Sequence, residues 1–203
     1  TVRECQIDAE EHPGDRLRMA GYRRALDAAL ALFPTDAELW LQRGVAEAVW
    51  HARHRSAFGK EIFGHPLMAN VLADLALECE AATLLAFRLS AAFDASASSA
   101  SERELQRALT PVAKYWLCKR MTAVATEAME CLGGNGYVEE SPLARLYREA
   151  PLNGIWEGSA NVICLDALRA FARAPESIVA LEAEVAAGSD ARLAGRFGQA
   201  LRA

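Results

Sequence analysis

The apolar positions of this chain recur at helical spacing over most of its length. Between residues 66 and 94, apolar side chains are separated by steps of three or four residues, so they line one face of a helix. This face comprises Leu67, Val71, Leu75, Cys79, Ala82, Ala86, Leu89 and Phe93. The pattern predicts one long helix with a continuously apolar face.

Signals for helix starts predict further helices. Ser or Thr followed by Pro supplies a cap and a first helical position, and this pair occurs at residues 110–111 and 141–142. The first pair predicts a long helix to about Leu132, preceded by a short helical turn, and the second a short helix ending before Pro151. Ser159 can cap another helix over about residues 161–173, and Pro175 opens a last one.

The N-terminal part predicts a helical hairpin. A first helix begins after Pro13 and stops at Pro34, and a capping box at residues 35–38 starts a second that closes near Phe58-Gly59. The segment FPTDAELWLQRGVAEA, residues 33–48, resembles the junction between tetratricopeptide repeats. With a single unit in view, an ordinary helical hairpin is an equally good interpretation, because solenoid units need neighbours to bury their faces.

These elements predict the fold class. No stretch shows sustained period-two alternation and β-branched residues are sparse, so we expect an all-α fold, an antiparallel helical bundle with an N-terminal helical hairpin. The predicted domains are a tetratricopeptide-like appendage over residues 1–44, the bundle over 45–187 and a truncated helical tail over 188–203.

Composition narrows the class of protein. Of 203 residues, 52% are hydrophobic and 24% charged, which is typical of a folded domain, and the net charge of -5 offers no global attraction for nucleic acid. No apolar run approaches the roughly 20 residues that span a bilayer, so we expect no membrane span. The charged N-terminus lacks the apolar core of a secretory signal.

The cysteines and histidines predict no metal site. The five cysteines are scattered singles, so we expect reduced, buried thiols in an intracellular, cytoplasmic protein. The four histidines do not pair with them at ligand spacings. The cysteines are Cys5, Cys79, Cys118, Cys131 and Cys164, and the histidines are His12, His51, His54 and His65.

Three stretches carry candidate chemistry. Three glycines lie within residues 133–136, where the backbone can adopt positive φ and let a ligand approach closely. Further along, Glu157 stands between an aromatic residue and a glycine, just before a predicted helix. A third stretch, residues 53–60, ends a predicted helix with cationic side chains and a glycine. Two interpretations of this stretch stay open. Its cationic side chains and glycine are favourable at the C-terminus of a helix, or a guanidinium is placed there to bind a diphosphate.

Taken together, four motifs in this order and spacing resemble the C-terminal helical domain of acyl-CoA dehydrogenases. The likeness covers about residues 45–173 and is strongest to the branch of flavoproteins linked to the bacterial adaptive response to DNA alkylation. The motifs are R-x-x-F-G-K at 55–60, L-G-G-N-G-Y at 132–137, R-L-Y-R-E-A at 145–150 and I-W-E-G-S-A-N at 155–161.

The resemblance implies an oxidoreductase with a carboxylate base. In the family, a glutamate removes the α-proton of an acyl-CoA thioester while hydride leaves the β-carbon for flavin N5. Glu157 stands in the matching position and is therefore the expected catalytic base. Without the motif, a solvated carboxylate at a helix N-terminus would be the preferred interpretation.

The resemblance also implies FAD as cofactor. One set of matching positions contacts the flavin of a neighbouring subunit and another holds the cofactor of the same subunit. The expected cofactor-binding residues are Arg55, Phe58, Ile62, His65, Glu130, Gly133, Gly134, Ser159 and Asn161. Three of these depart from many relatives, which carry Gln at position 130, Thr at 159 and Gln at 161, and Glu130 would bring a negative charge near a diphosphate.

The expected partners follow from the same resemblance. They are an acyl-CoA substrate, electron-transfer flavoprotein or a similar acceptor, and further copies of the chain in a homotetramer or other homo-oligomer. The family also uses an N-terminal helical domain and a middle β-domain, so we expect a fragment or a fusion. Two alternatives stay open: a duplex DNA-binding protein using Arg145, Arg148 and Arg169, and an inactive helical interaction module.

Overall fold

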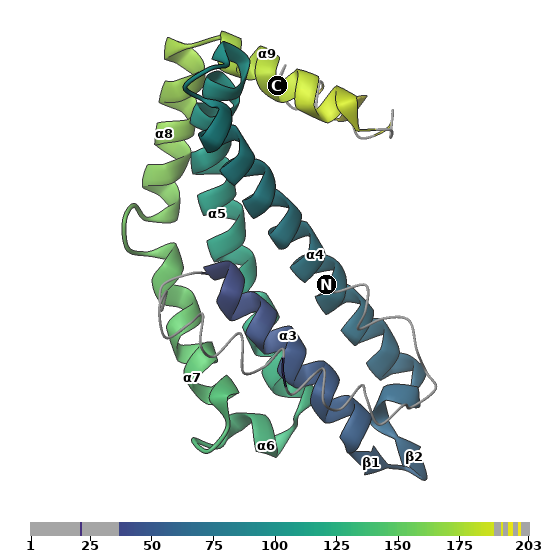
Figure 1. Ribbon diagram of the computed structural model, residues 1–203. Coiled ribbons are helices and arrows are strands. Elements are labelled where there is room, and N and C mark those ends of the chain that lie inside the picture. The colour runs from purple at the N-terminus through teal and green to yellow at the C-terminus, as the bar shows by residue number, and fades with distance from the viewer. Residues whose placement is uncertain (1–20, 22–36, 189–191, 193–194, 197–198, 200–203) are drawn as a thin grey trace. The chain divides into compact units, whose positions relative to one another are not determined.

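The computed structural model describes residues 21, 37–188, 192, 195–196 and 199 (Figure 1). The predicted first helix and the cap residues at 35–36 lie outside this part of the chain. The described residues confirm the all-α fold. Their helices are α3 (Ala37–His54), α4 (Pro66–Ala95), α5 (Ala100–Cys131), α6 (Gly134–Tyr137), α7 (Pro142–Glu149), α8 (Ala160–Arg173) and α9 (Glu176–Ala187), with 3-10 helices η1 (Ile62–Gly64) and η2 (Ala150–Gly154).

A short β-hairpin interrupts the helices after α3. Strands β1 (Ser56–Ala57) and β2 (Lys60–Glu61) pair antiparallel. The predicted extension of the second helix to Phe58-Gly59 is therefore wrong, because α3 ends at His54. Phe58 and Gly59 have φ of 55° and 86°, and positive φ at both central residues is what a type I′ two-residue turn requires.

Helix α5 contradicts the predicted start at Thr110. It runs without interruption from Ala100 through Pro111 to Cys131. The Thr110 hydroxyl does not cap a new helix but donates to the carbonyl of Gln106 at 2.6 Å. A proline inside a helix costs about 3 kcal/mol. Burial of neighbouring helix positions offsets that cost, and the buried residues are Ala108, Leu109 and Ala113.

The other helix starts follow the sequence signals. The Ser141 hydroxyl accepts a hydrogen bond from the Leu143 amide at 3.2 Å, which confirms the cap of α7. Ser159 precedes α8 as predicted, although its side chain makes no cap bond and its backbone carbonyl accepts from the Ile163 amide instead. Pro175 precedes α9.

The chain divides into two compact units. The first unit includes residues 37–84 and 117–156. Its core forms where α5 meets α7 and η2, and α3 contributes Trp40. Gly44 of α3 lies so close to α7 that a Cβ there would be 3.2 Å from Leu146 Cδ2. The buried core residues are Met121, Ala125, Leu143, Leu146 and Ala150.

The second unit includes residues 85–116 and 157–188. Arg88 of α4 joins three helices, because its guanidinium donates to Glu102 of α5 and to Glu184 of α9 at 2.7–3.0 Å. These bonds raise the pKa of Arg88 and lower that of Glu102. The buried core residues of this unit are Ala92, Leu105, Ala108, Leu109, Ala180 and Leu181.

The observed exposure of side chains differs from the prediction on the apolar face of α4 and at one cysteine. The apolar face predicted for α4 is buried at Leu75, Cys79 and Ala82, but its outermost members, Leu67 and Phe93, are 82% and 49% exposed. Steps of three and four residues only approximate 3.6, so a long face drifts away from the core it covers. Among the cysteines, Cys79, Cys118 and Cys131 are buried as predicted, but Cys164 is exposed and Cys5 lies outside the described residues.

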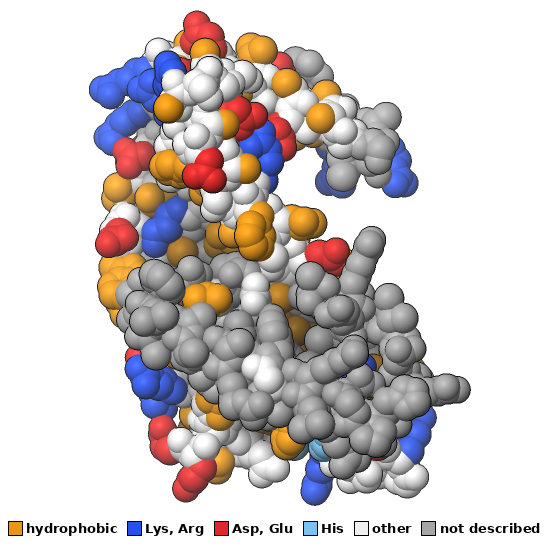
Figure 2. Space-filling view, in the orientation of Figure 1, with side chains coloured by type: hydrophobic (Ala, Val, Ile, Leu, Met, Phe, Trp, Pro, Cys, Tyr) orange, Lys and Arg blue, Asp and Glu red, His pale blue; other side chains and the backbone are white. Residues whose placement is uncertain are grey.

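Helix α8 leaves apolar side chains at the surface. None of its residues is buried, and Figure 2 shows hydrophobic side chains reaching the surface along it. The exposed large side chains on α8 are Val162, Leu165 and Leu168. Across the described part of the chain, no helix is both long and apolar enough to cross a membrane, and no group of metal-ligating side chains is found.

Candidate functional site

The tip of the β1–β2 hairpin presents an aromatic ring to solvent. Phe58 is 95% exposed and adopts φ of 55°. A left-handed conformation costs an ordinary L-residue about 1–2 kcal/mol, so this backbone is strained for the side chain it carries. Gly59 beside it is unstrained at φ 86°, and a Cβ there would meet nothing within 4 Å. The glycine is therefore needed for its backbone conformation and not for space.

Several contacts brace this hairpin from the segment that follows it. The His65 ring nitrogen Nε2 lies 3.0 Å from the Ala57 carbonyl oxygen, and its ring meets the Phe58 ring edge to face at 6.1 Å. On the other strand, Lys60 Nζ donates to the carbonyl of Gly64 at 2.6 Å.

Arg55 and Ile62 lie at the base of the same hairpin. The Arg55 amide donates to His51 at the end of α3, and its carbonyl accepts from the Ile62 amide, both at 2.9 Å. The Arg55 side chain is exposed, and Ile62 is half-buried. Burial, and then the charge of Arg55, lower the pKa of His51. The helix-capping interpretation of Gly59 is wrong, because that glycine belongs to the hairpin turn.

The three glycines of the turn after α5 meet different structural requirements. Gly133 adopts φ 58° and ψ -140°, a combination that is almost confined to glycine. Gly136 is buried, and a Cβ there would lie 2.3 Å from the Met129 carbonyl oxygen. Gly134 is exposed and meets neither constraint. The sequence singled out the cluster, but only the structure separates the glycine needed for φ from the glycine needed for space.

Glu130 lies at the C-terminal end of α5, one turn before these glycines. Its side chain is exposed, and its carbonyl accepts from the Gly133 amide at 2.9 Å. The next residue, Cys131, is buried. Burial, together with the charges of Glu127 and Glu130, raises the pKa of Cys131 to about 11, so its thiol stays protonated at neutral pH.

Glu157 occupies a strained position in the loop before α8. It adopts φ 52°, and its side chain is exposed. Gly158 follows at φ 106°, where a Cβ would lie 2.8 Å from Ile163 Cδ1. Within the part of the chain that the structure describes, Glu157 and Phe58 are the only residues other than glycine with positive φ. Strain of this kind concentrates at functional sites.

Trp156, the residue before Glu157, is anchored in the first unit. Its indole Nε1 donates to Asn153 Oδ1 at 3.2 Å, and Asn153 Nδ2 donates to Met121 Sδ at 3.2 Å. Asn153 is only 4% exposed. Sequence reasoning missed Asn153, because a single asparagine in a predicted loop carries no signal of its burial.

The predicted site residues fall into three local groups. The hairpin holds one group and the glycine turn another, both in the first unit, and the loop before α8 holds the third, in the second unit. Ser159 and Asn161 in that third group are exposed. The groups are, in order, Arg55, Phe58, Ile62 and His65; Glu130, Gly133 and Gly134; and Glu157, Ser159 and Asn161.

The arginines proposed for DNA contact each face a carboxylate. Arg148 donates to both carboxylate oxygens of Glu139 at 2.7 and 3.0 Å. Arg145 lies 3.8 Å from Glu149, and Arg169 lies 2.9 Å from Asp166. These side chains are exposed pairs of the kind that contributes little to stability. Nothing in this arrangement favours binding of a nucleic acid backbone.

The comparisons with known proteins all point to the same family. Residues 37–172 match the model of the acyl-CoA dehydrogenase C-terminal domain. The chain is 46% identical over 153 residues to AidB of Escherichia coli (strain K12), covering 75% of this chain and 27% of that protein. It is 36% identical over 115 residues to the mitochondrial short-chain specific acyl-CoA dehydrogenase of Bos taurus, covering 57% and 26%.

A solved structure shows the same fold. The crystal structure of Caenorhabditis elegans ACDH-11, in complex with C11-CoA, superposes with a TM-score of 0.71 at 31% identity and covers 73% of this chain and 26% of that one. The chain thus spans about a quarter of the length of each of these relatives. The family match begins at Ala37, before the domain boundary predicted at residue 45, and that boundary stays a prediction.

Proposed function

Because the chain belongs to the acyl-CoA dehydrogenase family, whose C-terminal domain it carries, we propose that it supplies the catalytic base and part of the FAD site of an acyl-CoA dehydrogenase. One observation carries the proposal. The two strained residues other than glycine, Phe58 and Glu157, both stand at positions where the family resemblance expects function.

Glu157 acts in this proposal as the general base. Its exposed carboxylate accepts the α-proton of an acyl-CoA thioester. When bound, the flavin supplies the acceptor for the hydride that leaves the β-carbon. A carboxylate base works best where water is excluded. We expect the apolar surface that covers Glu157 to come from the other domains of the family, since this chain spans only 27% of the length of AidB.

The hairpin has the chemistry to hold a dinucleotide cofactor. Arg55 offers an exposed guanidinium, which binds diphosphates bidentately, and Phe58 offers an exposed ring on which an aromatic group can stack. In the glycine turn, Gly133 and Gly134 let a ligand approach the backbone, while Glu130 places a negative charge that weakens diphosphate binding. Ser159 and Asn161 add exposed hydrogen-bonding groups.

The proposal also implies partners. Contacts from the hairpin reach the flavin of a second copy, so the complete enzyme is a homo-oligomer, a tetramer in our proposal. Electron-transfer flavoprotein or a similar acceptor reoxidises it, as expected from the family. We do not extend the proposal to duplex DNA, because Arg145, Arg148 and Arg169 each face a carboxylate.

The test combines this chain with a separately made portion that carries the N-terminal and β-domains of a family member. FAD binding is followed by the visible spectrum, and dehydrogenation is assayed across acyl-CoA chain lengths. Arg55→Ala should weaken FAD binding. Glu157→Gln should keep the flavin and the unfolding midpoint but lower the rate by at least about a hundredfold.

Two results would count against the proposal. A mixture that never holds flavin would remove the assignments at the hairpin and the glycine turn, and would favour the helical interaction module. A Glu157→Gln variant with unchanged turnover would show that another group takes the proton. Arg145→Ala is the matched control, since it removes an exposed arginine outside the proposed site.

A further inference from the structure

Phe58 needs support from outside its own turn. Its backbone conformation is unfavourable for a side chain with a Cβ. Its ring is almost fully exposed, so packing against the rest of the protein does little to hold it in place. The strand pairing on which it stands consists of two residue pairs, Ser56 with Glu61 and Ala57 with Lys60. A two-stranded hairpin is marginally stable at best on its own, so further contacts have to fix the turn.

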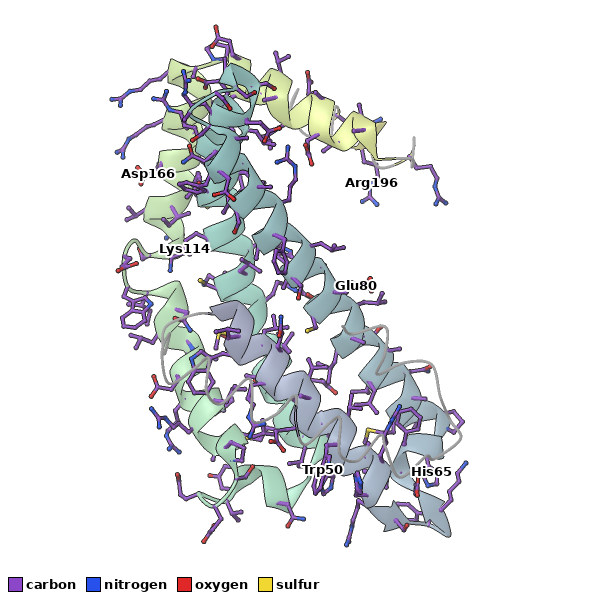
Figure 3. All side chains as sticks on the ribbon, in the orientation of Figure 1. Trp50, His65, Glu80, Lys114, Asp166 and Arg196 are labelled. Carbon is purple, nitrogen blue, oxygen red and sulfur yellow. The ribbon has the colours of Figure 1, made fainter. Side chains whose placement is uncertain are left out.

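His65 contacts the hairpin at two points next to Phe58. A carbonyl oxygen only accepts hydrogen bonds, so Nε2 of His65 carries the proton in its 3.0 Å contact with Ala57. That carbonyl belongs to the planar peptide unit that ends at the Phe58 nitrogen. Holding this plane restricts the φ of Phe58, which is the rotation about the next bond. Figure 3 shows His65 beside the hairpin, at the start of α4.

The second contact fixes the direction of the ring. The rings of His65 and Phe58 meet at an interplanar angle of 89° with centroids 6.1 Å apart, which is the edge-to-face arrangement that aromatic pairs prefer. His65 itself is only half-buried, so the ring of Phe58 is the more exposed of the two. One residue therefore restrains both the backbone and the side chain of Phe58.

We infer that His65 is a positioning residue that holds Phe58 in its left-handed conformation and so presents the phenyl ring to a ligand. This role differs from the direct cofactor contact that the family resemblance predicts for His65. The inference rests on the proposed function only for the identity of the ligand that Phe58 meets. The geometry of the turn can be tested without that ligand.

The test separates the two contacts with three substitutions in the full chain. His65→Gln keeps a side-chain N–H donor for Ala57, His65→Phe keeps an aromatic edge for Phe58, and His65→Leu keeps neither. NMR of the chain labelled at phenylalanine reports the amide and ring resonances of Phe58 and the coupling between its amide and α protons. Lys60→Met is the control. It removes the hydrogen bond that the side chain of Lys60, in strand β2, donates to the Gly64 carbonyl, and it leaves both His65 contacts.

We expect His65→Leu to change both the coupling and the ring shifts. His65→Gln should restore the coupling and His65→Phe the ring shifts, while Lys60→Met leaves both near the parent values. In the reconstituted mixture, His65→Leu should weaken FAD binding about three- to tenfold, the effect of one net hydrogen bond, and His65→Gln should recover most of it.

The outcomes distinguish this inference from the proposed function. Phe58 resonances that stay unchanged in His65→Leu would overturn the positioning role. Changed resonances with unchanged FAD affinity would support that role and overturn the contact between Phe58 and the flavin. If His65→Leu fails to fold, the Gln and Phe variants decide by the same two signals. A parent chain that holds no flavin would overturn the proposed function, and the resonances would still decide the role of His65.

Discussion

The hairpin tip and the loop before α8 share the same pair of backbone conformations in different surroundings. Each places a residue other than glycine at positive φ, followed by a glycine at positive φ: Phe58-Gly59 at 55° and 86°, and Glu157-Gly158 at 52° and 106°. In the hairpin, the glycine is surrounded by open space. In the loop, the glycine backbone lies against Ile163.

The difference shows what each glycine contributes. Gly59 only supplies a conformation, and strand pairing together with His65 holds its strained neighbour. Gly158 supplies a conformation and also lets the loop backbone approach α8, so the side chain of Glu157 projects from a backbone that is closely packed. A substitution that adds a Cβ should therefore have unequal effects at the two sites.

The largest effect is expected for Gly158→Ala. Its Cβ would be strained at φ 106° and would lie 2.8 Å from Ile163 Cδ1, so we expect a loss of about 2–4 kcal/mol in the free energy of unfolding. Ile163→Val removes that terminal carbon. The double variant should therefore be more stable than the sum of the single losses predicts, by at least about 0.5 kcal/mol in denaturant titration. Simple additivity would show that φ alone makes the glycine necessary.

A smaller loss is expected for Gly59→Ala. A Cβ at this position meets no atom within 4 Å, so the cost is limited to the left-handed conformation, about 1–2 kcal/mol. Denaturant unfolding of Gly59→Ala and Gly158→Ala under the same conditions compares their losses in the free energy of unfolding directly. Equal losses at the two glycines would contradict the distinction between conformation and space.

The smallest effect, and one of opposite sign, is expected when asparagine replaces the strained residues. Asparagine tolerates positive φ, so Phe58→Asn and Glu157→Asn should both raise the free energy of unfolding, by about 0.5 kcal/mol at Glu157. The gain should be smaller at Phe58, because that variant also loses the ring contact with His65. In the reconstituted enzyme, Phe58→Asn should weaken FAD binding and Glu157→Asn should abolish turnover. A loss of stability at both positions would mean that the native side chains are not strained.

Local signals in the sequence predicted much of the fold. The period of the apolar positions predicts α4, because burial of Leu75, Cys79 and Ala82 depends only on residues that share one helix face. Ser141-Pro142 predicts the start of α7, because a cap involves atoms only two residues apart. The order and spacing of four motifs indicated the family that the match over residues 37–172 shows.

Signals of the same kind failed where distant packing decides. Thr110-Pro111 has the chemistry of a helix start, yet α5 continues through it, since burial of the flanking helix face outweighs the local preference. Asn153 is buried against Met121 of α5, 32 residues earlier in the chain, which no local pattern records. The hairpin was missed because two-residue strands are too short to show alternation.

By itself, the sequence determined the helical class, the family and the positions at which its chemistry is expected, because periodicity and motif order are properties of the chain alone. The tertiary structure decided the conformations at those positions. Positive φ at Phe58 and Glu157 is locally unfavourable, so it persists only where surrounding contacts hold it. At Phe58 those contacts include His65, eight residues from Ala57 in sequence and 3.0 Å from it in space.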